Sequence, residues 1–345
     1  MDFTPPRCPN PQCTRHTDPQ PGFYRRCGFY RPACRDEPQQ RYRCRSCRRG
    51  FSRQTFRHDR GDRRPDCNEP LFWLLISGVG LRQAGRALKL GIHAVQRKKR
   101  KFAKTMRLLH DNLCTRLPAG RTFVLDEEET YEGASIRPLT MPVVVEKETW
   151  FVVGTAVGSI RRLAPLGRRR RQLQDEEERR HGPRQDESSE CVHQVLEQLR
   201  QCIGGVPLVL RSDEKPTYGR IARAVFGPAV HHETTAGTRI RTTHNPLFPI
   251  NTTLAMTRDN CGRLRRRSWL VTKDRHCLQD HLHLFVVYRN YVRRRFNRDR
   301  KHETPAWFLG LVPRQLHPAE VLAWRQDWGQ RSIHPMSHDA TRTVA

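Results

Sequence analysis

The chain has 345 residues, 36% of them hydrophobic, and carries 64 Lys and Arg against 35 Asp and Glu, a formal net charge of +29. This length suits two or three compact domains, and a soluble protein this basic usually binds a polyanion. The longest apolar stretch, LFWLLISGVGL at 71–81, is about half of the roughly 20 residues that a membrane span needs. Because the amino-terminus also lacks an apolar signal core, we expect a cytoplasmic protein.

Residues 1–60 are rich in Cys, Pro and Arg and have few aliphatic side chains, so they cannot build an ordinary hydrophobic core. Cys8 and Cys13 enclose four residues, and Cys44 and Cys47 enclose two. Two short pairs on separate turns supply the four thiolates that tetrahedral Zn²⁺ requires, and metal binding would provide the missing folding energy. We therefore predict a zinc-binding module over 1–60 with these four ligands. The alternative ligands are Cys27, Cys34 and His16.

Residues 61–117 are predicted to form a helix-turn-helix domain, because GLRQAGRALKLGIHAVQRKKRKFAK at 80–104 fits two helices joined at 90–92. Gly91 can take the turn conformation, and Val95 packs the second helix against the first. We expect the second helix to enter a major groove of DNA, while the alternative is a solvated helix in a bundle. The residues expected to contact phosphates or base edges are His93, Gln96, Arg97, Lys98, Lys99 and Arg100.

Residues 121–160 change to Val- and Thr-rich segments that are typical of strands: TFVLDEE, LTMPVVVE and TWFVVGTAVG. The charged stretch 161–190 is predicted to be a loop or a disordered insertion. The elements predicted to follow are a helix over 191–203, a buried strand in VPLVLRSD, and helices over 251–267 and 276–294. The tail over 301–345 is expected to be loosely ordered.

Two aspartates each lie at or near the end of a predicted buried strand. Asp126 follows Phe123-Val124-Leu125, and Asp213 follows Leu208-Val209-Leu210 after two intervening residues. Two such acids on neighbouring parallel strands can share divalent cations, which suits phosphodiester displacement. Alternation along the strand puts Glu128 on the face of Asp126, as a spare ligand. Each aspartate taken alone is more often a strand-end or capping residue.

The order of these segments resembles the DDE transposases of bacterial insertion sequences. The resemblance rests on QRYRCRSCRRGF, the helix-turn-helix, VLDEEETYEG, LRSDEKPTY and RLRRRSWLVTKD, and it covers about residues 5–295. The chain is most similar to the first-numbered insertion-sequence family and its close relatives, in which a zinc-finger and helix-turn-helix part is fused to the catalytic part.

The resemblance implies an α/β RNase H-like catalytic core over 118–300, after a zinc-ribbon-like module and an all-α helix-turn-helix domain. In that fold the first catalytic Asp lies on the first strand, here Asp126, and the second at the end of the fourth, here Asp213. The third acid opens a later helix and falls on Asn251, with Asp259 as the alternative. Asn is a departure from the pattern, but its carbonyl oxygen is an adequate ligand for Mg²⁺ or Mn²⁺.

The resemblance also implies DNA contacts around the third catalytic position. Arg258 matches an Arg that follows the third acid in the family and would lie near a phosphate. The basic residues after it suit contact with the DNA backbone, or they form a solvated helix face. These residues are Arg263, Arg265, Arg266, Arg267 and Lys273.

The implied activity is metal-dependent cleavage and strand transfer at insertion-sequence ends. Its partners would be double-stranded DNA, both the terminal inverted repeats and the target, and further copies of the chain in a nucleoid-associated oligomer. The main alternative is an inactive or domesticated remnant that binds DNA as a regulator, and Asn251 favours it. A zinc-bearing RNA-binding protein is the third possibility, but it would not need two strand-end aspartates.

Overall fold

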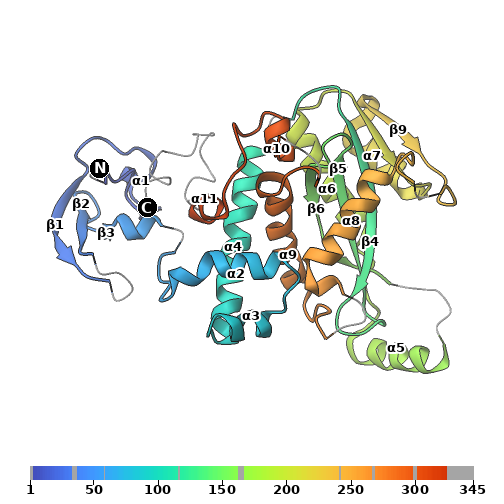
Figure 1. The fold of residues 1–345 in the computed structure, drawn as a ribbon, viewed down its shortest axis with the longest axis horizontal. Coiled ribbons are helices and arrows are strands. Elements are labelled where there is room, and N and C mark those ends of the chain that lie inside the picture. Colours follow the sequence, from blue (N-terminus) through green and yellow to red (C-terminus); the bar gives the residue numbers. More distant parts are fainter. Residues whose placement is uncertain are drawn as a thin grey trace. The chain divides into compact units, whose positions relative to one another are not determined.

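The computed structural model describes residues 3–32, 37–57, 59–115, 117–161, 167–240, 242–265, 269–297 and 301–324. The chain divides into two compact units, Met1–Pro70 with Ala319–Ala345, and Leu71–Pro318. Both are drawn in Figure 1. The first unit contains α1 (Thr14–Thr17), β1 (Tyr24–Tyr30), β2 (Gln39–Cys44), β3 (Gly50–Ser52) and the 3-10 helices Arg53–Phe56 and Pro65–Cys67. The next helix, α2 (Asn68–Ile76), spans the boundary between the units at Pro70.

The first unit contains an antiparallel sheet with the strand order β1-β2-β3. Its core consists of aromatic rings and cysteines instead of aliphatic side chains, as the composition requires. Tyr42 and Phe51 lie on paired strands with ring centroids 5.8 Å apart, and Phe56 packs edge-on against Phe51. Aromatic rings bury a large area each, so a few of them can fill a small core.

The second unit is a mixed α/β domain. Its elements are α3 (Leu81–Ala87), α4 (Ile92–Leu113), β4 (Thr122–Tyr131), β5 (Pro138–Glu146), β6 (Val152–Thr155), β7 (Gly158–Ser159), α5 (Arg168–His181), α6 (Ser188–Ile203), β8 (Leu208–Ser212), α7 (Pro216–Phe226), β9 (Val230–Thr234), α8 (Phe248–Asn260), α9 (Arg275–Val287) and α10 (Pro305–Phe308). The helix α11 (Pro318–Ala323) follows at the unit boundary. The predicted strands and the helices α4, α6, α8 and α9 are therefore confirmed.

The sheet of the second unit has the order β6-β5-β4-β8-β9, with β7 pairing to β5. The pairs β4–β5 and β5–β6 are antiparallel, whereas β4–β8 and β8–β9 are parallel. Val124 of the central strand β4 packs into a core with residues of α8 and α9, such as Leu254 and Leu282. On the opposite face, Tyr218 of α7 reaches β4, and α6 packs along β5 and β6. Helices thus cover both faces of the sheet, as its apolar strands require.

The helices predicted as a separate helix-turn-helix domain belong largely to this second unit, because α4 packs along α9. The turn also differs from the expectation. Lys89 adopts the left-handed conformation with φ 52°, while Gly91 is extended and caps α4. Gly85 lets the turn close tightly, since a Cβ at this position would lie 2.7 Å from the Leu90 carbonyl oxygen.

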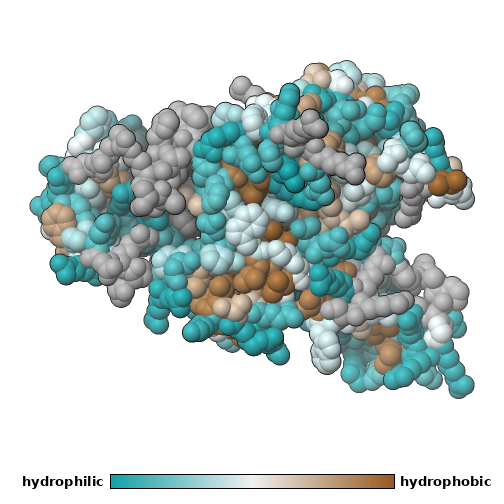
Figure 2. Space-filling view, in the orientation of Figure 1, coloured by the Kyte–Doolittle hydropathy of each residue, from teal (hydrophilic) through white to brown (hydrophobic). Residues whose placement is uncertain are grey.

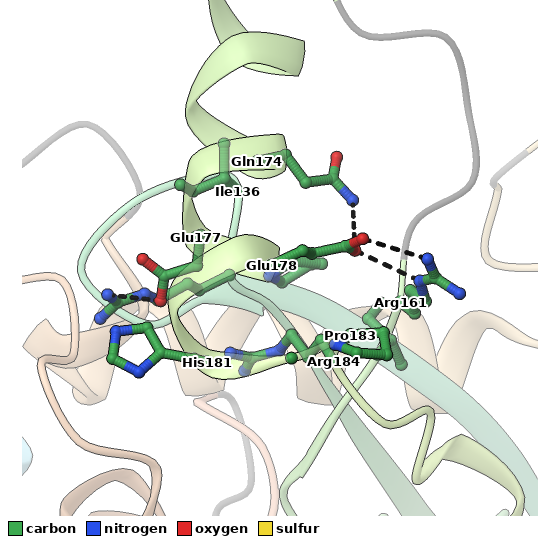
Figure 3. A pocket seen from close by; sticks show the side chains of 12 residues that line it. Ile136, Arg161, Gln174, Glu177, Glu178, His181, Pro183 and Arg184 are labelled. Carbon is green, nitrogen blue, oxygen red and sulfur yellow. Dashed lines mark hydrogen bonds and ion pairs between the residues drawn. The ribbon is translucent and has the colours of Figure 1, made fainter.

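The charged insertion is not a loop: its residues 168–181 form α5, and residues 162–166 lie outside the described part. None of the α5 side chains is buried. Ion pairs attach it to the sheet, with Arg137–Glu177 at 2.6 Å and Arg161–Glu178 at 3.1 Å (Figure 3). The prediction of a loop or disordered insertion was wrong because composition alone does not reveal ion pairs with residues outside the segment. The small cavity drawn in Figure 3, about 190 Å³, lies between α5 and the start of β5.

The prediction that the tail over 301–345 is loosely ordered is also partly wrong. Thr304 caps α10 by accepting a hydrogen bond from the Trp307 backbone, and the backbone nitrogen of Leu316 donates to the carbonyl of Tyr291 at 2.9 Å. These bonds attach the first part of the tail to the π-helical turn Tyr288–Val292 that extends α9. Residues 325–345 lie outside the described residues.

We expect Gly85→Ala to destabilise the second unit by about 1–3 kcal/mol, because the added methyl group would collide with backbone that cannot move freely. Gly237→Ala is the matched control, since no atom lies within 4 Å of a Cβ built there. Urea denaturation of both variants measures the difference. Equal midpoints for the two variants would show that the turn tolerates a side chain.

Candidate functional site

The four predicted zinc ligands come together in the first unit. The Sγ atoms of Cys8, Cys13, Cys44 and Cys47 all lie within 4.8 Å of one another. The Cys8–Cys47 and Cys13–Cys44 sulfur distances are 3.4 Å and 3.8 Å. Four thiolates at Zn–S distances of about 2.3 Å in a tetrahedron have sulfurs about 3.8 Å apart. The cluster can therefore hold a metal ion such as zinc.

Local turns present these thiols. Cys44 ends β2, and the Arg48 backbone nitrogen donates to its carbonyl at 3.1 Å, with Arg48 in the left-handed conformation (φ 57°). This tight knuckle brings Cys47 back beside Cys44. Cys13 lies at the amino end of α1.

Two of the three alternative ligands, His16 and Cys27, are described and lie outside the four-cysteine cluster. A ring nitrogen of His16 lies 2.7 Å from the carbonyl oxygen of Cys8, so His16 supports the loop instead of joining the sulfurs. Cys27 on β1 is only half-buried, and its sulfur lies 3.8 Å from the carbonyl oxygen of Arg25. Cys34 lies outside the described residues.

The second candidate site lies where β4 and β8 run side by side. These strands are parallel, with Phe123 opposite Leu210 and Val124 opposite Arg211. Continuing this register by two residues makes Asp126 level with Asp213, which directly follows the last residue of β8. Neighbouring strands are about 4.8 Å apart, and residues level with each other face the same side of a sheet. Asp126 and Asp213, the first residue after β8, are therefore expected close together where the pairing of β4 with β8 ends.

Helix α8 runs along one face of β4 (Figure 1). Arg258 of α8 makes an ion pair with Glu128, which lies two residues beyond Asp126 and is buried. Asn251 precedes Arg258 by seven residues, or two helical turns, and therefore shares its side of α8. Seven residues of helix rise about 10.5 Å. The chain after α8 reaches the far end of β4, where the nitrogen of Arg275 donates to a Glu132 carboxylate oxygen. The amino end of α8, with Asn251, therefore lies toward Asp126.

Asp259, the alternative third acid, lies one residue beyond Arg258 and is rotated by about 80–100° from the side that Asn251 and Arg258 share. Glu128, expected as a spare ligand, is engaged by Arg258 instead. Strand alternation alone could not predict the Arg258–Glu128 ion pair, because its two residues are 130 positions apart in the sequence.

Glu127 forms a second polar cluster on the opposite face of β4, which the sequence did not single out. Its carboxylate accepts hydrogen bonds from the Tyr218 hydroxyl at 2.8 Å and the Thr140 hydroxyl at 2.9 Å, and it forms an ion pair with Lys215. Burial and the adjacent Glu127 raise the pKa of Tyr218, so the phenol stays protonated as a donor. Because Lys215 is two residues after Asp213, this cluster fixes the β8 end against β4.

A serine and a histidine support the other side of Asp213. The buried Ser212 hydroxyl donates to the Asp213 carbonyl at 2.7 Å and lies 2.8 Å from Nε2 of His232 on β9. One carboxylate oxygen of Asp213 accepts the backbone hydrogen bond of Lys215 at 3.0 Å. This bond orients the Asp213 carboxylate at the end of β8.

The basic helix α4 has two very different faces. Its exposed side chains recur at helical spacing and give a basic stripe: His93, Arg97, Arg100, Lys104 and Arg107. Lys98 and Lys99 are instead buried, at 5% and 1% exposure. The Lys99 ammonium donates to the Cys277 carbonyl at 2.7 Å, and burial lowers its pKa to about 8.

This arrangement does not support the expected DNA contacts of Lys98 and Lys99. The sequence held the signal, because position 99 continues the spacing of Val95, Phe102, Met106 and Leu109, which form the buried face of the helix. The run of cations obscured that periodicity.

Three of the predicted DNA-contacting residues line one groove. Gln96 of α4 lines it together with Arg263 and Lys273, which are far away in the sequence. Burial lowers the pKa of Arg263, whose guanidinium lies 3.4 Å from the Thr272 hydroxyl, whereas Lys273 is exposed. Arg266 lies outside the described residues.

Comparisons with known proteins add no relatives: no protein family model matches the chain, and no curated protein matches it in sequence. Among the described residues, no helix is long and apolar enough to cross a membrane. The surface in Figure 2 is mostly hydrophilic, with hydrophobic residues gathered around α2 and α3. Function must therefore be inferred from the cysteine cluster, the strand-end acids and the basic groove.

We expect Cys44→Ser to abolish stoichiometric zinc binding and unfold the first unit, because that unit has little other core. Cys27→Ser should keep about one zinc per chain, since Cys27 lies outside the cluster. Elemental analysis of the purified full chain measures the metal, and circular dichroism with a chelator measures the folding. Equal zinc content in both variants would contradict this assignment.

We expect Lys99→Met to leave binding to duplex DNA and its salt dependence unchanged, because the lysine is buried. Arg97→Ala, two residues earlier on the exposed face, should lower the salt slope of binding by about one. Fluorescence anisotropy titrations at several salt concentrations compare the two variants. A reduced slope for Lys99→Met would show that the helix presents its other face to DNA.

Proposed function

We propose that the chain is a DNA transposase that cleaves and joins phosphodiester bonds at the ends of a mobile element. The observation that carries the proposal is the parallel β4–β8 pairing, whose register, continued two residues past its last pair, would bring Asp126 level with Asp213 just after β8. Asn251 on the overlying helix α8 completes the set. Three oxygen donors near the end of the β4–β8 pairing would suit a phosphoryl-transfer site better than a structural role, which would not need two neighbouring aspartates.

An RNase H-like core is supported by the order of the strands along the chain. With the two-residue β7 left aside, β4 is the first strand of the sheet and β8 the fourth. Asp126 lies on that first strand, and Asp213 directly follows the fourth. Asn251 lies in the first turns of a later helix. These are the positions that the resemblance to DDE transposases implies for the three catalytic residues.

The donor set fits a hard divalent cation. Carboxylate oxygens from Asp126 and Asp213 and the amide oxygen of Asn251 are the ligand types that Mg²⁺ or Mn²⁺ prefers. A cation held there would stabilise the negative charge that develops on the scissile phosphate. The two aspartates and Asn251 would orient it, while the Glu127 cluster and the Ser212–His232 pair keep the end of β8 in place.

The DNA itself would be held by the basic surfaces. The exposed stripe of α4 and the groove beside it supply Arg and Lys at a spacing suited to backbone phosphates. The four-cysteine module, loaded with zinc, would add a further contact. Pairing of two element ends would call for at least two copies of the chain, at the nucleoid.

We expect the full chain with Mg²⁺ or Mn²⁺ to cut DNA that flanks its own gene. Asp126→Ala and Asp213→Ala should each lower cleavage by at least about 100-fold, as removal of a group that acts on the transition state does. Glu129→Ala is the matched control, since it is an exposed acid on the same strand. Gel analysis of end-labelled DNA measures the products.

If both aspartate variants still cleave DNA, the proposed catalytic role of Asp126 and Asp213 is contradicted. Tight binding without any cleavage, not rescued by Asn251→Glu, would instead identify a DNA-binding remnant. That outcome would leave the fold and the DNA interface unchanged, so it separates the catalytic proposal from the binding one.

A further inference from the structure

The groove beside α3 has walls from two distant parts of the second unit. One wall is formed by the start of α3 and the first turns of α4, and the other by Gly262, Arg263, residues 269–271 and Lys273. The groove encloses about 580 Å³, which is within the range of small-ligand sites. It is therefore large enough to receive one nucleotide.

Glycines hold the two walls in close contact. A Cβ on Gly262 would lie 2.5 Å from the carbonyl oxygen of Gly78, and a Cβ on Gly80 would lie 2.4 Å from the Leu270 side chain. The backbone nitrogen of Gly78 also donates to the Asn260 carbonyl at 3.0 Å. The groove is thus a consequence of tight packing between backbone segments, and its two sides are fixed relative to each other.

The lining of the groove is cationic and carries one prominent aromatic ring. Arg82, Arg86, Arg263 and Lys273 line it, and none of the described lining residues is acidic. Its one histidine, His281, is uncharged at neutral pH because burial lowers its pKa to about 3. The Trp269 side chain at the rim is 98% exposed.

An exposed tryptophan among cations has a specific chemical partner. The indole ring gains most from stacking on a flat aromatic surface, and the surrounding Arg and Lys favour an anion beside it. A nucleotide carries both groups, a base and a phosphate. In a fully paired duplex the base faces are already stacked on their neighbours, so only an unpaired nucleotide offers a free face to Trp269.

We propose that this groove binds an unpaired nucleotide of a DNA strand. The base stacks on Trp269, Gln96 meets the base edge, and Arg82, Arg86 and Lys273 bind the flanking phosphates. This inference rests on the proposed function, since the unpaired nucleotide would belong to a DNA strand that the chain cuts or joins. It adds a second, single-strand contact to the duplex contacts of α4.

The test uses a fluorescein-labelled 12-nucleotide single-stranded DNA of mixed sequence and the same sequence as a blunt duplex, with the full chain and no added Mg²⁺ or Mn²⁺. Trp269→Ala should weaken single-strand binding about 5- to 150-fold, the range for loss of one base–aromatic stack. Trp269→Phe should retain most of the affinity. Binding of the duplex should change less than about twofold for either variant.

Ile240→Ala is the matched control, because Ile240 is also a highly exposed apolar residue but does not line the groove. Arg86→Ala should lower the salt slope of single-strand binding by about 0.7, whereas Trp269→Ala should leave the slope unchanged. Single-stranded DNA should also quench part of the tryptophan fluorescence of the wild type that is missing from Trp269→Phe.

Equal single-strand affinity of Trp269→Ala and Ile240→Ala would overturn the proposal, and so would equal losses on single strand and duplex. Tighter binding of an RNA of the same sequence would assign the groove to RNA instead. Asp126→Ala should bind the single strand as the wild type does. The binding test therefore gives a result even for a chain that does not cleave DNA, so failure of this proposal can be distinguished from failure of the catalytic proposal.

Discussion

The pairing of β4 with β8 is the constraint on which the rest of the second unit depends. β4 is the central strand, with Val124 packed against α8 and α9 and Phe123 buried on the other face. A one-residue slip would turn every side chain of this strand to the opposite face and would carry its acids into new apolar surroundings. This fixes the level of Asp126 relative to Asp213, and the Glu128–Arg258 ion pair fixes α8 above them.

The two units are stabilised by different interactions. The second buries aliphatic side chains between a sheet and helices, which needs no ligand. The first packs aromatic rings around four thiols, and close thiols contribute stability mainly when a metal binds them. Only the first unit should therefore depend on metal for its folding, and loss of zinc would leave the acidic strand ends assembled.

The large positive charge of the chain has more than one use. Arg97 and Arg100 are exposed on α4, whereas Lys99 and Arg289 are buried almost completely. Burial lowers the pKa of Arg289 to about 9 and that of Lys99 to about 8, so part of the formal charge works against folding. The net charge therefore overstates the exposed basic surface, and the groove and the α4 stripe define that surface better.

The sequence by itself determined the features that are local or periodic. The cysteine pairs, the Val-rich strands and the aspartates at strand ends were predictable, because each depends on a few neighbouring residues. The ion pairs of α5, the burial of Lys99 and the Glu127 cluster were decided by partners far away in the chain. The groove at Trp269 was likewise decided by tertiary structure, since it joins segments more than 160 residues apart. A sequence shows which side chains are present, but only packing determines which of them lose water and which remain available to a ligand.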